Sequence, residues 1–245
     1  MNCWRCGSHS AFKFIATIFQ NRSESAKQIF KQYQINNPIA KKSEVKLRKK
    51  QAPKPPQLGP LGKIHRNYLR NRKFNSQVIW DWDLSATKGL SGKWSWRIIA
   101  PICDADGSII AYGGRAIKPD VKPKWKFSTN EDWTIDPKKA IYGLNKVPGD
   151  RILIVEGMSD CWRMGFGSVG VFGIDWKEEQ ASQLKNFQHR FIMFDPEKQA
   201  QVQARKLADW LSPFPGETEI ISGLKSDPGE LSQYEANNIM QELGF

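Results

Sequence analysis

The chain of 245 residues is long enough for one large domain or two small ones, and a hydrophobic content of 40% can supply a packed core. Lysine and arginine outnumber aspartate and glutamate by 37 to 25, and the net charge of +12 favours a polyanionic partner, most simply nucleic acid. No apolar run reaches the roughly 18 residues of a membrane span, no apolar core of a signal peptide is visible, and the four cysteines do not make a disulfide framework. We therefore expect a cytoplasmic protein that has no membrane partner.

Residues 1–35 are predicted to form a small unit of their own. Cys3 and Cys6 have the spacing of a Cys-x-x-Cys zinc knuckle, and His9 follows as a third candidate ligand. A structural zinc site needs four ligands, so two interpretations stay open: these residues bind zinc, or the knuckle is vestigial or truncated. The apolar spacing of residues 10–34 indicates two short helices.

Residues 36–62 are predicted to be a linker. They contain five prolines and many lysines but almost no large apolar residue, so they can bury too little surface to offset the loss of chain entropy. The segment is either a solvated tail without a role or a basic tether that contacts nucleic acid.

Residues 63–150 are predicted to form a mixed α+β basic subdomain. A helix is expected at residues 65–74, and the apolar segments 94–102 and 108–117 are typical of half-buried strands. The sequence CDADG at residues 103–107 favours a turn, so these two strands should pair as an antiparallel hairpin.

Residues 151–245 alternate regularly between strand and helix patterns. Strands are expected at residues 152–156, 168–173, 190–194 and 218–222, and helices at residues 159–165, 177–187, 200–211 and 232–243. Such alternation predicts parallel strands with crossover helices, so the fold class expected here is α/β.

Acidic residues follow three of these predicted strands. They are Glu156 after the first, Asp195 and Glu197 after the third, and Asp227 and Glu230 after the fourth. Open α/β sheets bind ligands at the carboxyl ends of their strands, so these side chains should meet there, together with Asp160 one helical turn after Glu156. Gathered carboxylates repel one another unless a cation neutralises them, and carboxylate oxygens suit Mg²⁺ or Mn²⁺ better than zinc. Each acid also has an alternative role as the cap of a following helix.

The segments around these acids resemble the motifs of a known catalytic module. EGMSD, FDPEK and SDPGE are similar to the three acidic motifs of the TOPRIM domain, which bacterial primases, topoisomerases and some nucleases share. Upstream, WRIIAPICDADGSIIAYGGRAI, KPKWKFST and KKAIYGLNK resemble the basic half of the RNA-polymerase core in DnaG-type primases. YLRNRKF resembles the helix that opens that core, and the cysteine knuckle resembles the second half of the primase zinc ribbon. The resemblance covers nearly the whole chain except the linker.

This resemblance implies a Rossmann-like TOPRIM subdomain at residues 151–245, with the template in a groove beside the basic subdomain. It implies that Glu156 is the general base or a metal-orienting acid, with Asp160 and Asp195 as further catalytic acids. The implied ligands of divalent ions that bind nucleotide phosphates are Glu156, Asp160, Asp195, Glu197, Asp227 and Glu230.

The resemblance also assigns basic side chains to the template, the primer or the triphosphate. They are Arg97, Arg115, Lys124, Lys126 and one of Lys138 or Lys139. Each of them has an ordinary alternative as a solvated surface charge. Trp125 is a candidate for stacking on single-stranded bases.

By the same resemblance, the expected function is that of a DNA primase. Such an enzyme makes short RNA primers from ribonucleoside triphosphates on single-stranded DNA by metal-dependent nucleotidyl transfer. A replicative helicase acting in trans is an expected partner. The compact form, without a helicase segment, favours a phage or plasmid origin, which would place a viral protein in the host cytoplasm.

Two positions depart from the pattern of the family. Glu197 stands where a second aspartate is usual, and Gly229 stands where a second acid is usual. These departures keep open a catalytically weakened factor that binds or loads single-stranded DNA. A TOPRIM-type nuclease or topoisomerase is a separate alternative; the upstream basic half argues against a nuclease, and the lack of a suitable nucleophilic tyrosine argues against a topoisomerase.

Overall fold

The computed structural model describes residues 2–3, 7–8, 50–87, 92–224 and 226–245. The chain divides into two compact units, Met1–Arg48 and Lys49–Phe245. In the first unit, strands β1 (Asn2–Cys3) and β2 (Gly7–Ser8) pair in antiparallel fashion. The candidate zinc-binding side chains of Cys3, Cys6 and His9, and the two helices expected within residues 10–34, lie outside what is described.

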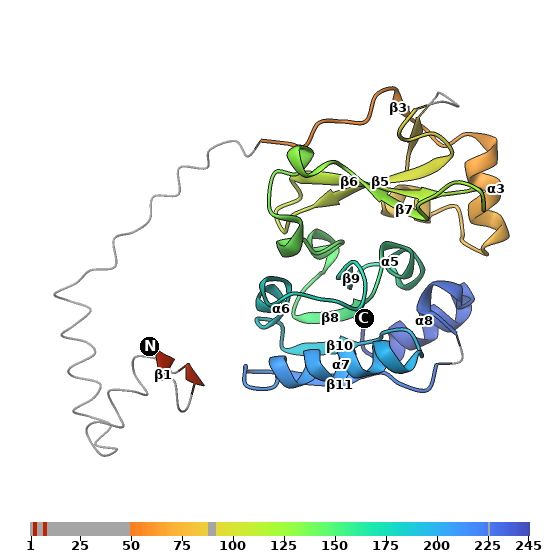
Figure 1. The fold of residues 1–245 in the computed structure, drawn as a ribbon. Coiled ribbons are helices and arrows are strands. Elements are labelled where there is room, and N and C mark those ends of the chain that lie inside the picture. Colours follow the sequence, from red (N-terminus) through yellow and green to blue (C-terminus); the bar gives the residue numbers. More distant parts are fainter. Residues whose placement is uncertain (1, 4–6, 9–49, 88–91, 225) are drawn as a thin grey trace, which may run out of the picture. The chain divides into compact units, whose positions relative to one another are not determined.

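The N-terminal part of the second unit is built on a three-stranded antiparallel sheet (Figure 1). Its strands, in spatial order, are β5 (Arg97–Cys103), β6 (Ile109–Ala116) and β7 (Trp125–Phe127). Gly107 closes the turn between β5 and β6 with a φ of +85°, and its N–H donates to the carbonyl of Asp104 at 3.0 Å. The predicted hairpin is therefore confirmed.

Short elements surround this sheet. They are β3 (Leu58–Gly59), α3 (Lys63–Asn71), α4 (Val78–Asp81), β4 (Ala86–Thr87), and the 3₁₀ helices η1 (Asn130–Asp132), η2 (Pro137–Lys139) and η3 (Leu144–Lys146). The helix expected at residues 65–74 is present as α3, but it ends earlier. Lys73 takes a φ of +59°, which is incompatible with a continuing right-handed helix.

Residues 50–62, the described part of the predicted linker, contact this sheet. Ala52 is buried and its N–H donates to the carbonyl of Ile109 at 2.9 Å, while β3 pairs with β4. Leu61 is also buried. The segment departs from the expectation for a solvated linker because extended backbone can pair with a sheet edge even where few side chains are apolar.

The C-terminal part of the second unit is a four-stranded parallel sheet in the order β11-β10-β8-β9. The strands are β8 (Arg151–Val155), β9 (Ser168–Gly170), β10 (His189–Ile192) and β11 (Glu217–Ile220). The helices are α5 (Met158–Met164), α6 (Glu178–Leu184), α7 (Lys198–Leu211) and α8 (Gln233–Glu242), and η4 (Pro228–Glu230) precedes α8. The alternation read from the sequence is confirmed, because all neighbouring strands pair in parallel.

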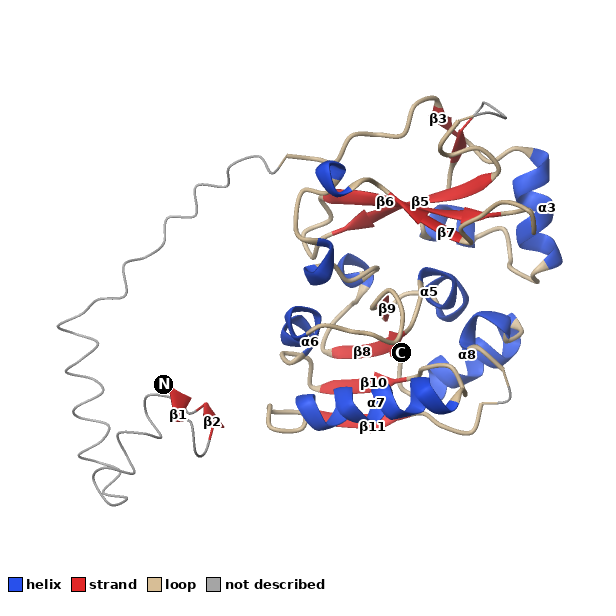
Figure 2. Cartoon of the chain, in the orientation of Figure 1, coloured by secondary structure: helices blue, strands red, loops and turns tan. Residues whose placement is uncertain are grey.

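Helices cover both faces of this parallel sheet (Figure 2). Ile152 and Ile154 of β8 pack in one apolar cluster with side chains of α6 and α7. Leu153 and Val155 point to the other face and pack with side chains of α5 and α8 in a cluster that also reaches β5 and β6. Alternate residues of β8 pack on opposite faces of the sheet, and both faces are buried. For this reason the sequence of β8 is a continuous run of apolar residues.

A buried arginine joins α5 to the end of α3. The side chain of Arg163 has no exposed surface, and its guanidinium donates to the carbonyls of Arg72 at 2.6 Å and Lys73 at 2.9 Å. These bonds hold the parallel sheet's first helix against the segment that precedes the antiparallel sheet.

No helix in the described parts of the chain is both long enough and apolar enough to cross a lipid bilayer.

Candidate functional site

Acidic side chains from three strand ends line one cavity. Glu156 directly follows β8, Asp195 follows β10 and Asp227 follows β11, and parallel strands bring their carboxyl ends to the same edge of the sheet. These three residues and Asp160 of α5 line a cavity of about 270 Å³, which we call the acidic cavity. The sequence prediction that these acids gather at one place thus agrees with the geometry.

The other two predicted acids lie outside this lining. Glu197 is exposed, yet its charge is near enough to raise the pKa of both Glu156 and Asp195. Glu230 lies on η4 and is exposed. The cavity is therefore formed by four of the six acids that the sequence singled out.

Burial and mutual repulsion raise the pKa of two acids at the strand ends, Asp195 and Glu156. Burial raises the pKa of Asp195 to about 8, and repulsion from Glu156, Asp160 and Asp227 adds to the effect. Burial also raises the pKa of Glu156 to about 7, although a hydrogen bond from the N–H of Asp195 at 2.8 Å opposes the shift. These carboxylates are costly to ionise together without a neutralising charge.

Asp195 has an unpaired oxygen inside the protein. Its Oδ1 atom is buried and has no hydrogen-bond partner, whereas Glu156 accepts a backbone hydrogen bond. A buried carboxylate oxygen without a donor is unfavourable and is unusual in folded proteins. This oxygen has unused hydrogen-bonding capacity, and the side chain would have to rotate before a ligand could reach it.

Asp160 combines a capping role with its place in the cavity. Its Oδ2 atom accepts from the N–H of Gly157 at 2.8 Å, at the start of α5. Burial raises the pKa of Asp160 to about 6, and repulsion from Asp227 adds to this, while Arg72 and Arg115 lower it. The capping alternative considered from the sequence is therefore true of Asp160, and it does not remove this acid from the cavity.

The structure gives a steric reason for glycine at position 229. A Cβ atom on Gly229 would lie 2.6 Å from Oδ1 of Asp160, closer than real Cβ contacts allow. A second acid at this position, as the family pattern suggests, has no room in this arrangement.

Basic and aromatic side chains complete the acidic cavity. Arg115 of β6 and Lys124 line it, together with Trp125 and Phe127 of β7. The guanidinium of Arg115 lies 5.5 Å from the centre of the Trp125 ring. A cation of this kind beside carboxylates can bind the phosphate groups of a ligand.

Tyr68 and Arg72 of the α3 region support this basic side and are absent from the predicted site. The Nε atom of Arg115 donates to the hydroxyl of Tyr68 at 3.1 Å. Burial alone would raise the pKa of Tyr68, but the guanidinium groups of Arg115 and Arg72 lower it below its usual range. The motif YLRNRKF contains both residues. This motif is the sequence feature that could have identified them, because their spacing relative to the acids carries no pattern.

The remaining predicted basic residues lie in other places. Arg97 is buried and its guanidinium donates to the carbonyl of Gly114 at 3.1 Å, so it packs the β5–β6 hairpin instead of facing a ligand. Lys126 alternates with Trp125 and Phe127 along β7 and does not line the acidic cavity. Lys138 and Lys139 are exposed, and each lines a different surface cavity.

A divalent cation fits the chemistry of the acidic cavity. Carboxylate oxygens are its preferred ligands, and the unpaired oxygen of Asp195 lies among carboxyl groups whose ionisation needs a neutralising charge. Within the described residues, however, no three His, Cys, Asp or Glu side chains already stand close enough to form a metal cluster. The acids would have to adjust their rotamers to bind an ion together.

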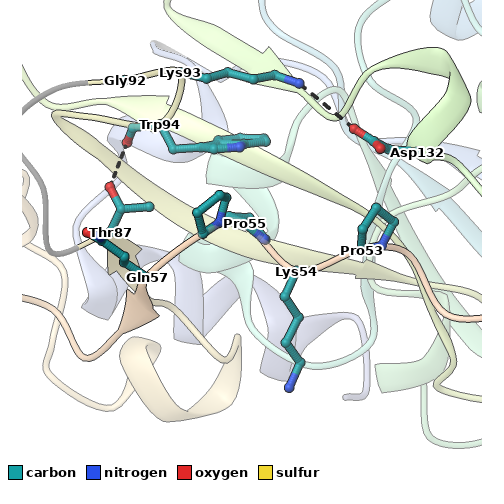
Figure 3. A pocket seen from close by; sticks show the side chains of 10 residues that line it. Pro53, Lys54, Pro55, Gln57, Thr87, Gly92, Lys93, Trp94 and Asp132 are labelled. Atoms are coloured by element: carbon teal, nitrogen blue, oxygen red, sulfur yellow. Dashed lines mark hydrogen bonds and ion pairs between the residues drawn. The ribbon is translucent and has the colours of Figure 1, made fainter.

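A larger cavity lies away from these acids. It measures about 510 Å³ and is lined by Pro53, Pro55, Lys93, Trp94 and Asp132 among others (Figure 3). Asp132 is the one carboxylate among its described lining residues, and it pairs with Lys93 at 3.9 Å. This cavity does not offer the cluster of acids that metal-dependent chemistry needs.

Known proteins resemble this chain in sequence and in fold. The family described as the N-terminal domain of the DNA primase catalytic core matches residues 14–147. The DNA primase of Clostridium acetobutylicum is 32% identical over 105 residues, which are 40% of this chain and 17% of that protein. The chain thus spans far less than two thirds of that relative.

Two solved structures show the same fold. One is a DnaG primase catalytic domain bound to ssDNA, with 19% identity, a TM-score of 0.62, and coverage of 76% of this chain and 72% of that chain. The other contains the zinc-binding and RNA polymerase domains of the Aquifex aeolicus primase. It has 19% identity and a TM-score of 0.60, and the match covers 74% of this chain and 56% of that chain. They confirm the predicted fold class, a parallel α/β sheet with flanking helices beside a mixed α+β part.

The family match extends over more than half of the residues, and the chain therefore belongs to the DNA primase catalytic core family, through that family's N-terminal domain.

Proposed function

We propose that this chain is the catalytic core of a DNA primase. It would synthesise short RNA primers from ribonucleoside triphosphates on a single-stranded DNA template. The main support is the acidic cavity, in which Glu156, Asp160, Asp195 and Asp227 face the cationic side chains of Arg115 and Lys124. This pairing of charges suits a ligand that brings both a divalent ion and phosphate groups.

We infer that Glu156, Asp195 and Asp227 would hold Mg²⁺ or Mn²⁺. The bound ion would neutralise the carboxylates and stabilise negative charge on the phosphoryl oxygens. Asp160 accepts the N–H of Gly157 and so keeps the start of α5 beside these ligands.

The reaction would be nucleotidyl transfer. The 3′-hydroxyl oxygen of the primer forms a bond to the α-phosphorus of a ribonucleoside triphosphate, and the bond from that phosphorus to pyrophosphate breaks. Glu156 is the candidate acceptor of the hydroxyl proton. Arg115 and Lys124 would bind the negative charge of the triphosphate and of the departing pyrophosphate.

Single-stranded DNA is the proposed template. The net charge of +12 supports a polyanionic partner, and one solved structure of the same fold is described as bound to ssDNA. Trp125, half-buried beside Arg115, offers an aromatic surface at the edge of the cavity.

The test is an assay with single-stranded DNA, labelled ribonucleoside triphosphates, and Mg²⁺ or Mn²⁺. Short RNA products that depend on the template and on the divalent ion would support the proposal. Cleaved DNA would instead support a nuclease, and DNA that is retarded in a gel but neither copied nor cut would support a weakened binding factor.

Three further expectations remain predictions. Zinc binding by Cys3, Cys6 and His9 can be tested by measuring zinc content in the purified protein, since a relative of the same fold is described by its zinc-binding domain. A helicase partner acting in trans, and a phage or plasmid origin, need interaction and genomic measurements.

A further inference from the structure

A pocket lined by aromatic side chains lies directly beside the acidic cavity. It measures about 310 Å³ and shares Phe127 and Phe172 with the lining of the acidic cavity. Trp133 completes its aromatic wall, and Asn130, Lys138 and Lys177 supply polar groups at its edge. We call it the aromatic pocket.

The three rings of this pocket contact one another. Phe127 and Phe172 meet edge to face with centres 5.5 Å apart, and Trp133 lies 6.4 Å from each of them. All three residues are only partly buried, so the rings are not simply interior core. Part of each ring is available to a ligand.

A fully bonded glutamine fixes the frame of the pocket. Gln180 is buried, and its amide group donates to the carbonyls of Ala140 at 2.8 Å and Val171 at 3.0 Å. Its carbonyl oxygen accepts from the N–H of Lys177 at 2.9 Å. These bonds connect the loop after β9 with the segment after η2, so the pocket is built before any ligand arrives.

The backbone at Phe172 is strained. Phe172 has a φ of +64°, which bulky side chains rarely adopt. The N–H of the next residue, Gly173, donates to the carbonyl of Glu156 at 2.8 Å. This bond ties the segment that carries Phe172 to Glu156 of the acidic cavity. Phe172 lines both the acidic cavity and the aromatic pocket, so its ring separates them.

We propose that the aromatic pocket holds an unstacked nucleobase whose phosphates lie in the acidic cavity. This inference rests on the function proposed above and extends it to a base-binding subsite. Every base has a flat apolar face that stacks on aromatic rings, and the pocket volume is at the lower end of those that bind small molecules. The base belongs either to the incoming ribonucleotide or to the single strand, and the two sources can be separated by experiment.

The test compares ligands with and without a base. ATP is compared with inorganic tripolyphosphate, and a dT oligonucleotide with an abasic oligonucleotide of equal length, all in Mg²⁺. The variants are Trp133→Ala and Phe172→Ala, with Phe172→Tyr as a variant that keeps the ring. Trp80→Ala is the matched control, because Trp80 is 76% exposed on α4 and lines neither hollow.

The expected result is that both alanine variants weaken binding of ATP, or of the dT oligonucleotide, about tenfold. Binding of the matching base-free ligand should stay the same, and Trp80→Ala should bind like the unchanged protein. Phe172→Tyr keeps the ring and should therefore lose less base binding than Phe172→Ala. Loss confined to ATP identifies the incoming nucleotide, and loss confined to dT identifies the strand.

Unchanged binding of both base-containing ligands by the alanine variants would overturn the inference. Equal loss of ATP and tripolyphosphate would overturn it too, because it would show general damage rather than lost stacking. If the protein makes primers but the variants bind ATP and dT normally, only the base subsite fails. If it makes none while the variants lose base-dependent binding, the proposed function fails and the subsite stands.

Discussion

Single carboxylates in the acidic cavity carry the chemistry proposed for this protein. Glu156 is tied to the neighbouring strand end by the N–H of Asp195, so its position depends on the sheet rather than on its own loop. Replacing one carboxylate oxygen by an –NH₂ group, as in Glu→Gln, keeps the shape of the side chain and removes its charge. Residue-scale predictions can therefore separate charge from shape.

We predict that Glu156→Gln lowers primer synthesis by at least about 100-fold with little loss of DNA binding. The substitution removes a charge from the acidic cavity and leaves Arg115 and Lys124 in place. Synthesis and gel retardation are to be measured on the same preparation, with Glu242→Gln, an exposed change on α8, as the control. Full synthesis by Glu156→Gln would rule out its proposed role.

We predict that Asp195→Asn stabilises the metal-free protein. The pKa of Asp195 in the folded state, about 8, is above the value of an unfolded aspartate, so its contribution to stability is complete at low pH and is lost as pH rises through about 8. The neutral amide avoids that loss, and the gain at pH 8 should be on the order of 1 to 3 kcal/mol. Thermal melts in EDTA between pH 5 and pH 8 should show a Tm advantage that grows with pH, and Asp209→Asn, an exposed change on α7, is the comparison variant.

Gly229 is predicted to be intolerant of any side chain. A methyl group there would meet Oδ1 of Asp160 at 2.6 Å, and relieving that contact should cost about 1 to 3 kcal/mol of stability in Gly229→Ala. Denaturant unfolding can be compared with Glu230→Ala, the exposed neighbour. Equal stability of the two variants would mean that η4 shifts freely.

At the scale of elements, helix α3 positions Arg115 of strand β6. Tyr68 of α3 accepts the Nε hydrogen bond of Arg115 on β6, and Arg163 of α5 holds the carbonyls at the end of α3. The basic side of the cavity is therefore set by contacts between elements that are distant in sequence.

We predict that Tyr68→Phe raises KM for ribonucleoside triphosphates about fivefold and leaves kcat nearly unchanged, since one hydrogen bond is worth about 1 kcal/mol. The ring remains, so the fold should be preserved. Steady-state kinetics with Tyr234→Phe, a 75% exposed tyrosine on α8, provide the comparison. A fall in kcat at constant KM would show that Tyr68 does not act by orienting Arg115 in the ground state.

At the scale of the whole molecule, excess positive charge should control binding to DNA. Each phosphate neutralised by the protein releases counterions, so the logarithm of affinity for single strands should fall by about 0.7 per contacted phosphate for each tenfold rise in salt. Titrations of a dT oligonucleotide at increasing NaCl measure this slope. A peptide nucleic acid of the same sequence lacks phosphates and should bind weakly with no such slope, and a flat response with dT itself would contradict the polyanion argument.

The sequence was sufficient for the alternation of strands and helices and for the gathering of Glu156, Asp195 and Asp227. Apolar runs followed by acids are local patterns, and parallel pairing necessarily brings strand ends together. The same reasoning misjudged residues 50–62 and Arg97, because backbone pairing and burial depend on neighbours that no local pattern reveals.

Only the tertiary structure showed that Tyr68 supports Arg115 and that Phe172 lines the acidic cavity. Tyr68, Arg115 and Phe172 come from segments far apart in the chain, and no periodicity connects them. The raised pKa values of Glu156 and Asp195 likewise arise from burial and from charges on other elements. Local sequence determined the position of each acid at the end of its own strand. The packing of distant segments determined the neighbours and the burial of each acid, because contacts and desolvation exist only once the chain has folded.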